Sequence, residues 1–288
     1  FEWVVELLKA LEKQTIEDFK VIIIVNGNMR YFRKLSNVVK NEIEAIYEIQ
    51  VVFNPTDKGI AHSRNIALEY AKTPYIAYTD DDAIPHARWL EELLSALEQN
   101  RKVGAVTGPV LCKWEQDTED YASWFPEELY WIIGCTSRKI NRLTVVRNGF
   151  ASNLALKRKI LLKTGGFNED LGYSQRNLIA GEETELGIKL LRAGYVTVWN
   201  PKAIIFHRIF KERLRMSNIL TRSFVEGKTK AYINQRYGSG VIKTEANHLQ
   251  SIVKHFIKTR SFKSKALLLN TTIAVLSGYL AYRALRFQ

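Results

Sequence analysis

Three adjacent aspartates, the triplet Asp80–Asp82, directly follow the apolar segment Tyr75–Thr79. Carboxylates this close repel one another, so a fold that keeps them together needs a compensating partner. In an open α/β sheet the carboxyl end of a strand is where ligands gather. On an extended backbone, Asp80 and Asp82 point to the same side. Two carboxylates that leave open positions for phosphate oxygens suit Mg²⁺ or Mn²⁺. We therefore predict a divalent metal site here, in preference to a solvated acidic turn.

A glycine-containing loop enters a helix between Lys58 and Arg64. Gly59 permits a tight approach of the backbone, and the start of the helix offers free N–H groups to an anion. Arg64 adds a fork of donors for phosphate or carboxylate. The segment is typical of a phosphate-binding helix entry, although basic residues are common at such junctions.

An acidic pair, Glu182 and Glu183, opens a predicted helix that ends before Gly194. Acids in a first helical turn ordinarily complement the helix dipole. The alternative is that one of the two is a general base. The residue types by themselves leave this choice open.

The elements that must position these groups alternate along the chain. Continuous apolar runs predict buried strands, and these lie at residues 19–25, 49–53, 75–79, 103–110 and 196–199. Helical spacing predicts helices at residues 4–11, 32–46, 61–71, 87–99, 157–164 and 182–193. This rhythm indicates βαβ units and an α/β sheet. The irregular, aromatic-rich residues 114–147 are expected to pack rather than to line a ligand groove.

Five segments, taken in order, resemble glycosyltransferase family 2 of the GT-A fold. They are FKVIIIVNGN, DKGIAHSRNIAL, YIAYTDDDAIPHARWLEEL, RNGFASNLALKRKILLKTGGFNEDLG and GEETELGIKLLRAGY. The resemblance implies an α/β fold with a GT-A (Rossmann-like) mixed sheet flanked by helices, over about residues 1–210. It also implies an inverting, metal-dependent, hexosyltransferase-type enzyme that moves a sugar from a nucleotide-sugar donor to a hydroxyl acceptor, with Mn²⁺ or Mg²⁺ as cofactor.

The resemblance also implies roles for particular residues. The catalytic base is Glu183 or Glu182. The metal ligands are Asp82, Asp80 and His207. The acceptor side includes Asn153 and Trp89. The donor is bound by Asn26, Lys58, Gly59, Arg64, Asp80, Asp81 and Asp82.

This sequence departs from the family's pattern at three points. The chain starts in the helix after the family's first strand, which helps to hold the nucleobase. Val25 stands at the end of the second strand, where the family usually has an acid. The catalytic pair is Glu182-Glu183 instead of Glu-Asp, and a glutamate performs the same proton transfer with one more methylene of reach.

The net charge of +12 is confined to the end of the chain. Residues 1–210 hold 27 basic and 27 acidic residues, whereas residues 211–288 hold 15 basic and 3 acidic residues. We therefore expect a neutral catalytic domain, residues 1–210, followed by a basic, mostly helical C-terminal region, residues 211–288. No motif that reads nucleic acid accompanies the charge, so nucleic acid is not an expected partner.

An uncharged segment, residues 266–282, is near the lower length limit for a membrane-spanning helix. As a helix it gathers polar and small residues on one side, namely Asn270, Thr271, Ser277 and Gly278. The opposite face is rich in leucine, which is typical of an interfacial helix. Cations flank the segment: Lys254, Lys258, Arg260, Lys263 and Lys265 before it, and Arg283 and Arg286 after it. We expect a cytoplasmic enzyme held peripherally at a membrane surface, and the other interpretation is a docked helix at a homo-oligomer contact.

Two further hypotheses fit parts of the sequence. Val25 and the Glu-Glu pair would also suit a membrane-associated binding or scaffold protein on a degenerate transferase fold. A nucleotidyltransferase uses paired acids and Mg²⁺ as well, and releases pyrophosphate. Cys112 and Cys135 are too few for a disulfide scaffold and match no zinc spacing, so we expect two free thiols in a reducing compartment.

Overall fold

The computed structural model describes residues 1–137, 139–172, 179–238 and 243–284. Its contacts divide the chain into two compact units. The first unit comprises Phe1–Val110, Arg138–Leu178 and Glu182–Phe206, and the second comprises Leu111–Ser137, Ile179–Gly181 and His207–Gln288. The last segment of the second unit starts at His207, near the expected boundary at residue 210, and residues 111–137 and 179–181 belong to this unit as well.

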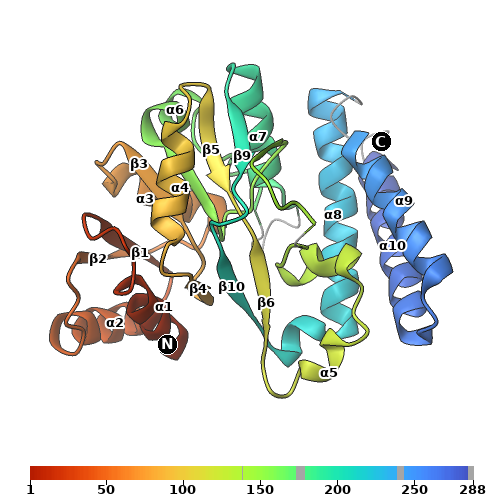
Figure 1. Ribbon diagram of the computed structural model, residues 1–288, viewed down its shortest axis with the longest axis horizontal. Coiled ribbons are helices and arrows are strands. Elements are labelled where there is room, and N and C mark those ends of the chain that lie inside the picture. Colours follow the sequence, from red (N-terminus) through yellow and green to blue (C-terminus); the bar gives the residue numbers. More distant parts are fainter. Residues whose placement is uncertain (138, 173–178, 239–242, 285–288) are drawn as a thin grey trace. The chain divides into compact units, whose positions relative to one another are not determined.

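A five-stranded mixed sheet forms the centre of the first unit (Figure 1). Its strands, in spatial order, are β3 (Tyr75–Tyr78), β8 (Leu154–Lys157), β5 (Val103–Thr107), β9 (Val196–Trp199) and β7 (Thr144–Val146). Strands β5 and β9 are parallel, and the other three pairs are antiparallel. This arrangement confirms the predicted mixed α/β sheet.

A separate parallel pair, β1 (Lys20–Asn26) and β2 (Glu48–Asn54), lies in the same unit. The register sets Lys20 opposite Glu48 and Asn26 opposite Asn54. The helices of this unit are α1 (Glu2–Leu11), α2 (Met29–Asn41), α3 (Ile60–Tyr70), α4 (Trp89–Glu98), α6 (Arg158–Lys163) and α7 (Glu182–Arg192). Leu8, Leu35, Leu97 and Val106 are buried in one continuous apolar cluster, so burial of the helices' apolar faces holds this unit together.

The apolar run at residues 103–110 forms two strands instead of the single predicted one. Strand β5 ends at Thr107, and β6 (Val110–Trp114) starts after Gly108-Pro109. A side chain at position 108 would collide with the carbonyl oxygen of Ala203. Strand β6 belongs to a small sheet with the order β4-β10-β6, in which β4 is Ala83–Pro85 and β10 is Ile205–Ile209. The unit boundary falls inside β6 and inside β10.

The second unit is mostly helical. Its elements are α5 (Glu119–Ala122), the 3₁₀ helices η1 (Glu127–Ile133) and η2 (Lys211–Leu214), and the long helices α8 (Met216–Tyr237), α9 (Lys243–Lys258) and α10 (Phe262–Ala284). The aromatic rings of residues 114–131 pack against one another, as expected: the ring of Phe125 lies 6.2 Å from those of Trp114 and Tyr130. No helix in the described part of the chain has the length and apolar character needed to cross a membrane.

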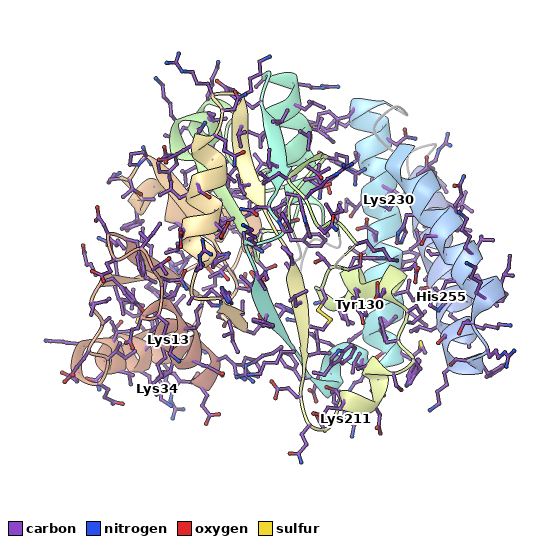
Figure 2. The ribbon with its side chains drawn as sticks, viewed as in Figure 1. Lys13, Lys34, Tyr130, Lys211, Lys230 and His255 are labelled. Atoms are coloured by element: carbon purple, nitrogen blue, oxygen red, sulfur yellow. A yellow bond between two sulfur atoms is a disulfide. The ribbon has the colours of Figure 1, made fainter. Side chains whose placement is uncertain are left out.

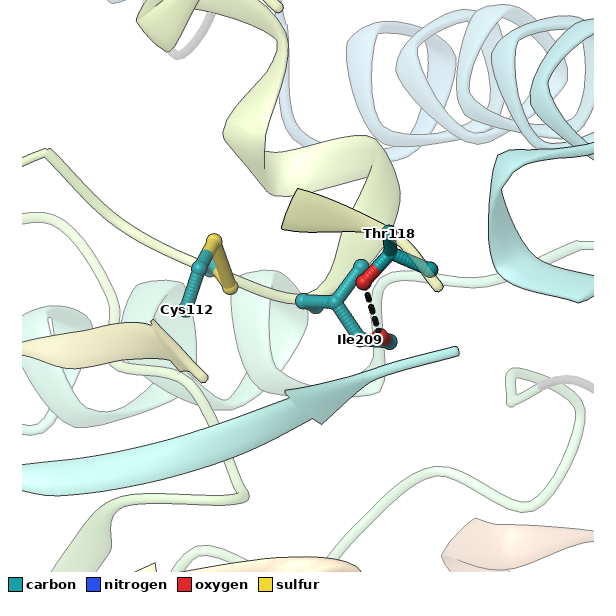
Figure 3. The surroundings of a disulfide bond; sticks show 4 residues. Cys112, Thr118 and Ile209 are labelled. Carbon is teal, nitrogen blue, oxygen red and sulfur yellow. Dashed lines mark hydrogen bonds between the residues drawn. A yellow bond between two sulfur atoms is a disulfide. The ribbon is translucent and has the colours of Figure 1, made fainter. Parts of the chain in front are cut away.

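Cys112 and Cys135 form a disulfide, so the expectation of two free thiols was wrong. Their Cα atoms are 5.7 Å apart and lie in β6 and just after η1 (Figure 3). Near this bond the Thr118 hydroxyl donates a hydrogen bond to the carbonyl oxygen of Ile209 at 2.9 Å. The disulfide therefore ties the aromatic-rich segment to the start of the second unit.

Candidate functional site

Arg64 is the centre of the candidate active site. It projects from the first turns of α3 and is only 8% exposed. Its Nη1 donates a hydrogen bond of 2.7 Å to Oε1 of Glu182 and lies 3.8 Å from Oε1 of Glu183. Its Nη2 lies 3.9 Å from Oδ1 of Asp80. One guanidinium thus connects the predicted metal-binding triplet to the predicted catalytic pair, which lies more than a hundred residues further along the chain.

The charge of Arg64 is stable in this setting. Burial by itself would lower the pKa of Arg64, but the carboxylates of Glu183, Glu182 and Asp80 outweigh burial and raise that pKa above its usual value. Removing one partner of such a buried pair is costly in free energy, because the other charge is then left unpaired in a low dielectric. Arg64 and Glu182 therefore act as one ion pair in the first unit.

Glu183 differs from its neighbour in exposure and in proton affinity. Its side chain is 24% exposed, against 6% for Glu182. Oε1 of Glu183 accepts a hydrogen bond from the backbone N–H of Ala151 at 3.3 Å. Desolvation and the adjacent carboxylate of Glu182 raise the pKa of Glu183 to about 7, although Arg64 opposes the shift. A carboxylate with a pKa near neutrality that reaches solvent is suited to accept a proton.

The aspartate triplet forms a turn after β3, not the extended backbone that we predicted. The backbone N–H of Ala83 donates to the carbonyl oxygen of Asp80 at 3.2 Å. Asp82 is buried, Asp80 is half-buried and Asp81 is exposed. Asp80 and Asp82 each offer a carboxylate oxygen to a metal ion, whereas His207, the third predicted ligand, belongs to the second unit. Carboxylate oxygens are donors that fit Mn²⁺ or Mg²⁺.

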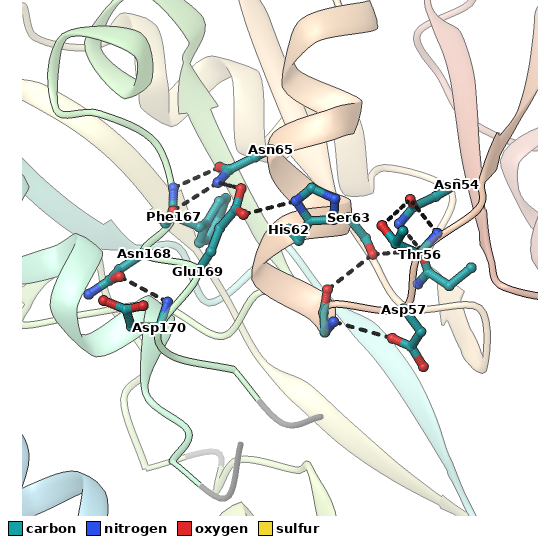
Figure 4. A network of polar contacts seen from close by, with 12 residues as sticks. Asn54, Thr56, Asp57, His62, Ser63, Asn65, Phe167, Asn168, Glu169 and Asp170 are labelled. Atoms are coloured by element: carbon teal, nitrogen blue, oxygen red, sulfur yellow. Dashed lines mark hydrogen bonds and ion pairs between the residues drawn. The ribbon is translucent and has the colours of Figure 1, made fainter. Parts of the chain in front are cut away.

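The entry to α3 is built by hydrogen bonds that start at the ends of β1 and β2. Asn26 accepts from the Ser63 hydroxyl at 2.9 Å and from the Asn54 side-chain amide at 2.8 Å. Gly59, the residue before α3, has a φ of 100°, which an L-residue rarely adopts. Its N–H donates to Asp57 at 3.2 Å, on the right of Figure 4. Lys58 is exposed beside this turn. The predicted phosphate-binding entry thus has a fixed backbone.

A second polar cluster in Figure 4 was not predicted from the sequence. Glu169 accepts from the Asn65 amide at 2.9 Å, and its other oxygen lies 2.9 Å from Nδ1 of His62. Asn65 also bonds both the N–H and the carbonyl oxygen of Phe167. These contacts hold the loop after α6 against α3. The polar run Asn168-Glu169-Asp170 is the sequence signal that could have indicated them.

Asn153 and Trp89 occupy the core instead of an acceptor surface. Trp89 is 2% exposed, and its indole N–H donates to Oδ1 of Asn153 at 2.8 Å. The Asn153 amide donates in turn to the carbonyl oxygens of Pro109 and Ala203. This burial argues against the predicted acceptor role. The two side chains instead connect the start of α4 to the backbone after β5 and after β9.

Comparison with known proteins adds to this geometry. Residues 1–165 match the sequence profile of Glycosyl transferase family 2. A glucosyl-dolichyl phosphate glucuronosyltransferase from Haloferax volcanii is 28% identical over 234 residues, which cover 81% of this chain and 72% of that protein.

Two solved structures share the fold. The mannosyltransferase PcManGT from Pyrobaculum calidifontis, in complex with GDP-Man and Mn²⁺, is similar with a TM-score of 0.57 and 17% identity, over 99% of this chain and 83% of that one. GalNAc-T7, with UDP, GalNAc and Mn²⁺, is similar with a TM-score of 0.53 and 13% identity; 84% of this chain is covered, but only 50% of the GalNAc-T7 chain.

Proposed function

The chain belongs to glycosyltransferase family 2, whose profile covers more than half of it, and from this we propose an inverting transfer of a sugar from a nucleotide-sugar donor to a lipid-linked hydroxyl acceptor. The observation that carries the proposal is the connection through Arg64 between Asp80 and the Glu182-Glu183 pair. This connection holds the donor's diphosphate site and the proton acceptor in one compact unit. Such positioning lowers the barrier of a displacement reaction, because the reacting groups are already held in place.

The donor side consists of the α3 entry and the aspartate turn. We assign the donor's diphosphate to Lys58, the backbone at Gly59 and the aspartate turn, with Asn26 supporting the loop by its hydrogen bonds. Asp80 and Asp82 would hold Mn²⁺ or Mg²⁺, and His207 stays the third ligand expected from the sequence. When bound, the metal would supply a Lewis acid that neutralises charge on the diphosphate. Both similar solved structures contain Mn²⁺, which supports this assignment.

The acceptor side consists of Glu183. In the proposed reaction Glu183 removes the acceptor's hydroxyl proton while the acceptor oxygen bonds to the anomeric carbon. The bond from that carbon to the diphosphate breaks, and the nucleoside diphosphate leaves with the electron pair from the opposite face. Glu182 is a positioning residue, because its carboxylate is already held by Arg64. Arg64 in turn keeps enough positive charge near Glu183 to prevent its pKa from rising further.

A lipid-linked acceptor is proposed from the name of the Haloferax relative, which acts on glucosyl-dolichyl phosphate, and from the basic C-terminal region. We also propose that the chain is located peripherally at the cytoplasmic side of a membrane. Disulfides are rare in reducing cytosol except in hyperthermophilic archaea and bacteria. The Cys112–Cys135 bond is therefore the observation that weighs against a cytoplasmic location, and the oxidation state of these cysteines in cells tests that part of the proposal.

The experiment is a screen of nucleotide-sugars by thermal shift with and without Mn²⁺, because a ligand that binds the native state raises the melting temperature. The donor found in this way is then incubated with the chain, and the products are identified. Release of a nucleoside diphosphate that depends on Mn²⁺ or Mg²⁺ supports the proposal. Release of pyrophosphate would indicate a nucleotidyltransferase, and binding without turnover would indicate a binding or scaffold protein.

A further inference from the structure

The outer face of α10 is apolar along nearly its whole length. Five large side chains on it are between 52% and 83% exposed. These residues, which we call the apolar stripe of α10, are Phe262, Leu269, Ile273, Leu276 and Leu280. From Leu269 onward they recur at intervals of four, three and four residues, so they lie in line on one side of the helix. At 1.5 Å per residue the stripe is about 27 Å long. Isolated apolar residues on a surface are normal, but a continuous stripe marks an interaction site.

The inner face of α10 is mixed: its buried residues are Ser264, Leu267, Leu268, Thr271, Gly278 and Tyr282. Thr271 and Gly278 are buried on this face. A side chain at Gly278 would collide with the carbonyl oxygen of Phe224 in α8, and one at Gly227 in α8 would collide with the carbonyl oxygen of Val275. The two helix backbones therefore touch through glycines. Close contact of helix backbones through small residues, with large apolar residues exposed on the outside, is common in helices that face lipid.

Helix α9 repeats this arrangement on a shorter length. One side of it contacts η1: the Ser251 hydroxyl donates to Glu128, and Nδ1 of His255, labelled in Figure 2, lies 3.0 Å from the same carboxylate. On the other side a second apolar set is exposed, consisting of Leu249, Val253, Phe256 and Ile257. Along the sequence, exposed apolar residues thus recur from Leu249 in α9 to Leu280 in α10.

The charge around these faces has one sign. Residues 248–284 contain no aspartate or glutamate. The cations in this range are Lys254, Lys258, Arg260, Lys263, Lys265 and Arg283. Lys265 and Arg283 fall on the helical side of the stripe, near its two ends. Arg286 lies outside the described residues. An apolar face bordered by lysine and arginine is complementary to an anionic lipid surface, because the side chains enter the acyl boundary while the cations meet the headgroups.

We infer that the outer faces of α9 and α10 lie in the surface of a lipid bilayer that carries anionic headgroups, with the helices in the membrane plane. An in-plane position agrees with the finding that no described helix could span a membrane. This inference deepens the membrane location proposed above by naming the surface, and it requires nothing of the transfer chemistry. A second copy of the chain is a weaker occupant, because pairing two such faces would bring the same cations together.

The inference is tested by sedimentation of the full chain with vesicles of phosphatidylcholine, with and without 30% phosphatidylglycerol (about one lipid in three, enough to give a strong surface potential). We expect binding to the anionic vesicles, weaker binding to the neutral ones, and only partial release by salt, since salt screens charge but not apolar insertion. The double substitution Ile273→Asp/Leu276→Asp should lower the partition coefficient at least about tenfold.

A matched control is Asn270→Asp/Ser277→Asp. It places the same two charges on exposed positions of the same helix, beside the stripe, and removes no large apolar side chain. This control should also lower the partition coefficient. The change in the logarithm of that coefficient should be less than half of the change seen for the stripe variant. Equal vesicle binding by the stripe variant and the unsubstituted chain would overturn the inference. A dimer of the unsubstituted chain in analytical ultracentrifugation that is lost in the stripe variant would also overturn the inference, since a second copy would then cover the face. Nucleoside diphosphate release without vesicles reports on the transferase proposal separately.

Discussion

Arg64 and Glu182 form a buried hydrogen-bonded ion pair, with Nη1 and Oε1 2.7 Å apart. Glu182 is therefore not available as a base, because its carboxylate is hydrogen-bonded to Arg64 and its side chain is only 6% exposed. Glu183 remains, with an exposed edge and a raised pKa. The structure thereby gives a physical reason to choose between two glutamates that the sequence left equivalent.

Replacing Glu183 by glutamine should lower the rate of nucleoside diphosphate release by about 10²–10⁴-fold, the usual contribution of general base catalysis. Donor and metal affinity should stay close to those of the unsubstituted chain in calorimetry. Glu182→Gln is the matched variant, since its amide oxygen can still accept the hydrogen bond from Arg64, and it should keep most of the activity. An inactive Glu182→Gln beside an active Glu183→Gln would show that the roles are reversed.

The pH dependence follows from the raised pKa of Glu183, about 7. A base must be ionised, so kcat/KM should fall about tenfold per pH unit below that value. Glu182→Gln removes the adjacent negative charge, so it should lower the pKa of Glu183 and shift the acidic limb to lower pH. An acidic limb at the same pH in Glu182→Gln would contradict the assignment of Glu183 as the base.

The free energy of unfolding should also depend on the ionisation of Glu183. Between the usual value of 4.5 and about 7, the folded chain binds the proton of Glu183 more tightly than the unfolded chain does. The contribution of Glu183 to stability should therefore decrease as the pH increases through this range. Urea unfolding of Glu183→Gln, which cannot ionise, should lack this decrease. An identical pH dependence in both chains would contradict the raised pKa.

Asp82→Ala should abolish the Mn²⁺-dependent part of nucleoside diphosphate binding, because Asp82 is the buried carboxylate of the group that could hold a metal ion. Asp18→Ala is a suitable control, since it removes the same charge from an exposed position outside the proposed site. Isothermal titration with and without Mn²⁺ measures the difference. Unchanged metal-dependent affinity in Asp82→Ala would remove this residue from the metal site.

The disulfide should stabilise the second unit. Closing a loop of 23 residues is worth about 3 kcal/mol in the chain-entropy model. The variant Cys112→Ser/Cys135→Ser should unfold at lower urea concentration, and a reductant should bring the unsubstituted chain to the same midpoint. The double variant serves as its own control, because a reductant should not change it. If the reductant leaves the unsubstituted chain unchanged as well, the bond does not form in solution.

The sequence predicted those parts of the fold that local pattern decides. The apolar runs at residues 19–25 and 75–79 became β1 and β3, and helical spacing located α1, α3, α4 and α7 within a few residues. The run at residues 103–110 was misjudged because Gly108-Pro109 was taken as part of the strand, although proline cannot donate a hydrogen bond to the ladder. The close approach of position 108 to the carbonyl oxygen of Ala203 is a distant contact, about which periodicity carries no information.

The candidate site was predicted in its residue types but not in its geometry. Asp80, Arg64, Glu182 and Glu183 were all identified, yet nothing in their spacing showed that one arginine joins them. Trp89 and Asn153 were misplaced because a motif position does not reveal burial. The pairing of Cys112 with Cys135 depends on how β6 and η1 are placed, which two cysteines alone do not indicate.

The position of β9 has a consequence for synthesis on the ribosome. This strand lies between β5 and β7, although it follows them in sequence by tens of residues. At 5–20 residues per second, roughly 5 to 18 s pass between the emergence of β5 and that of β9. During this interval one edge of β5 has no partner strand, and an open apolar edge is a template for pairing with other chains. A nascent chain of this protein is therefore expected to need a chaperone until Trp199 has emerged.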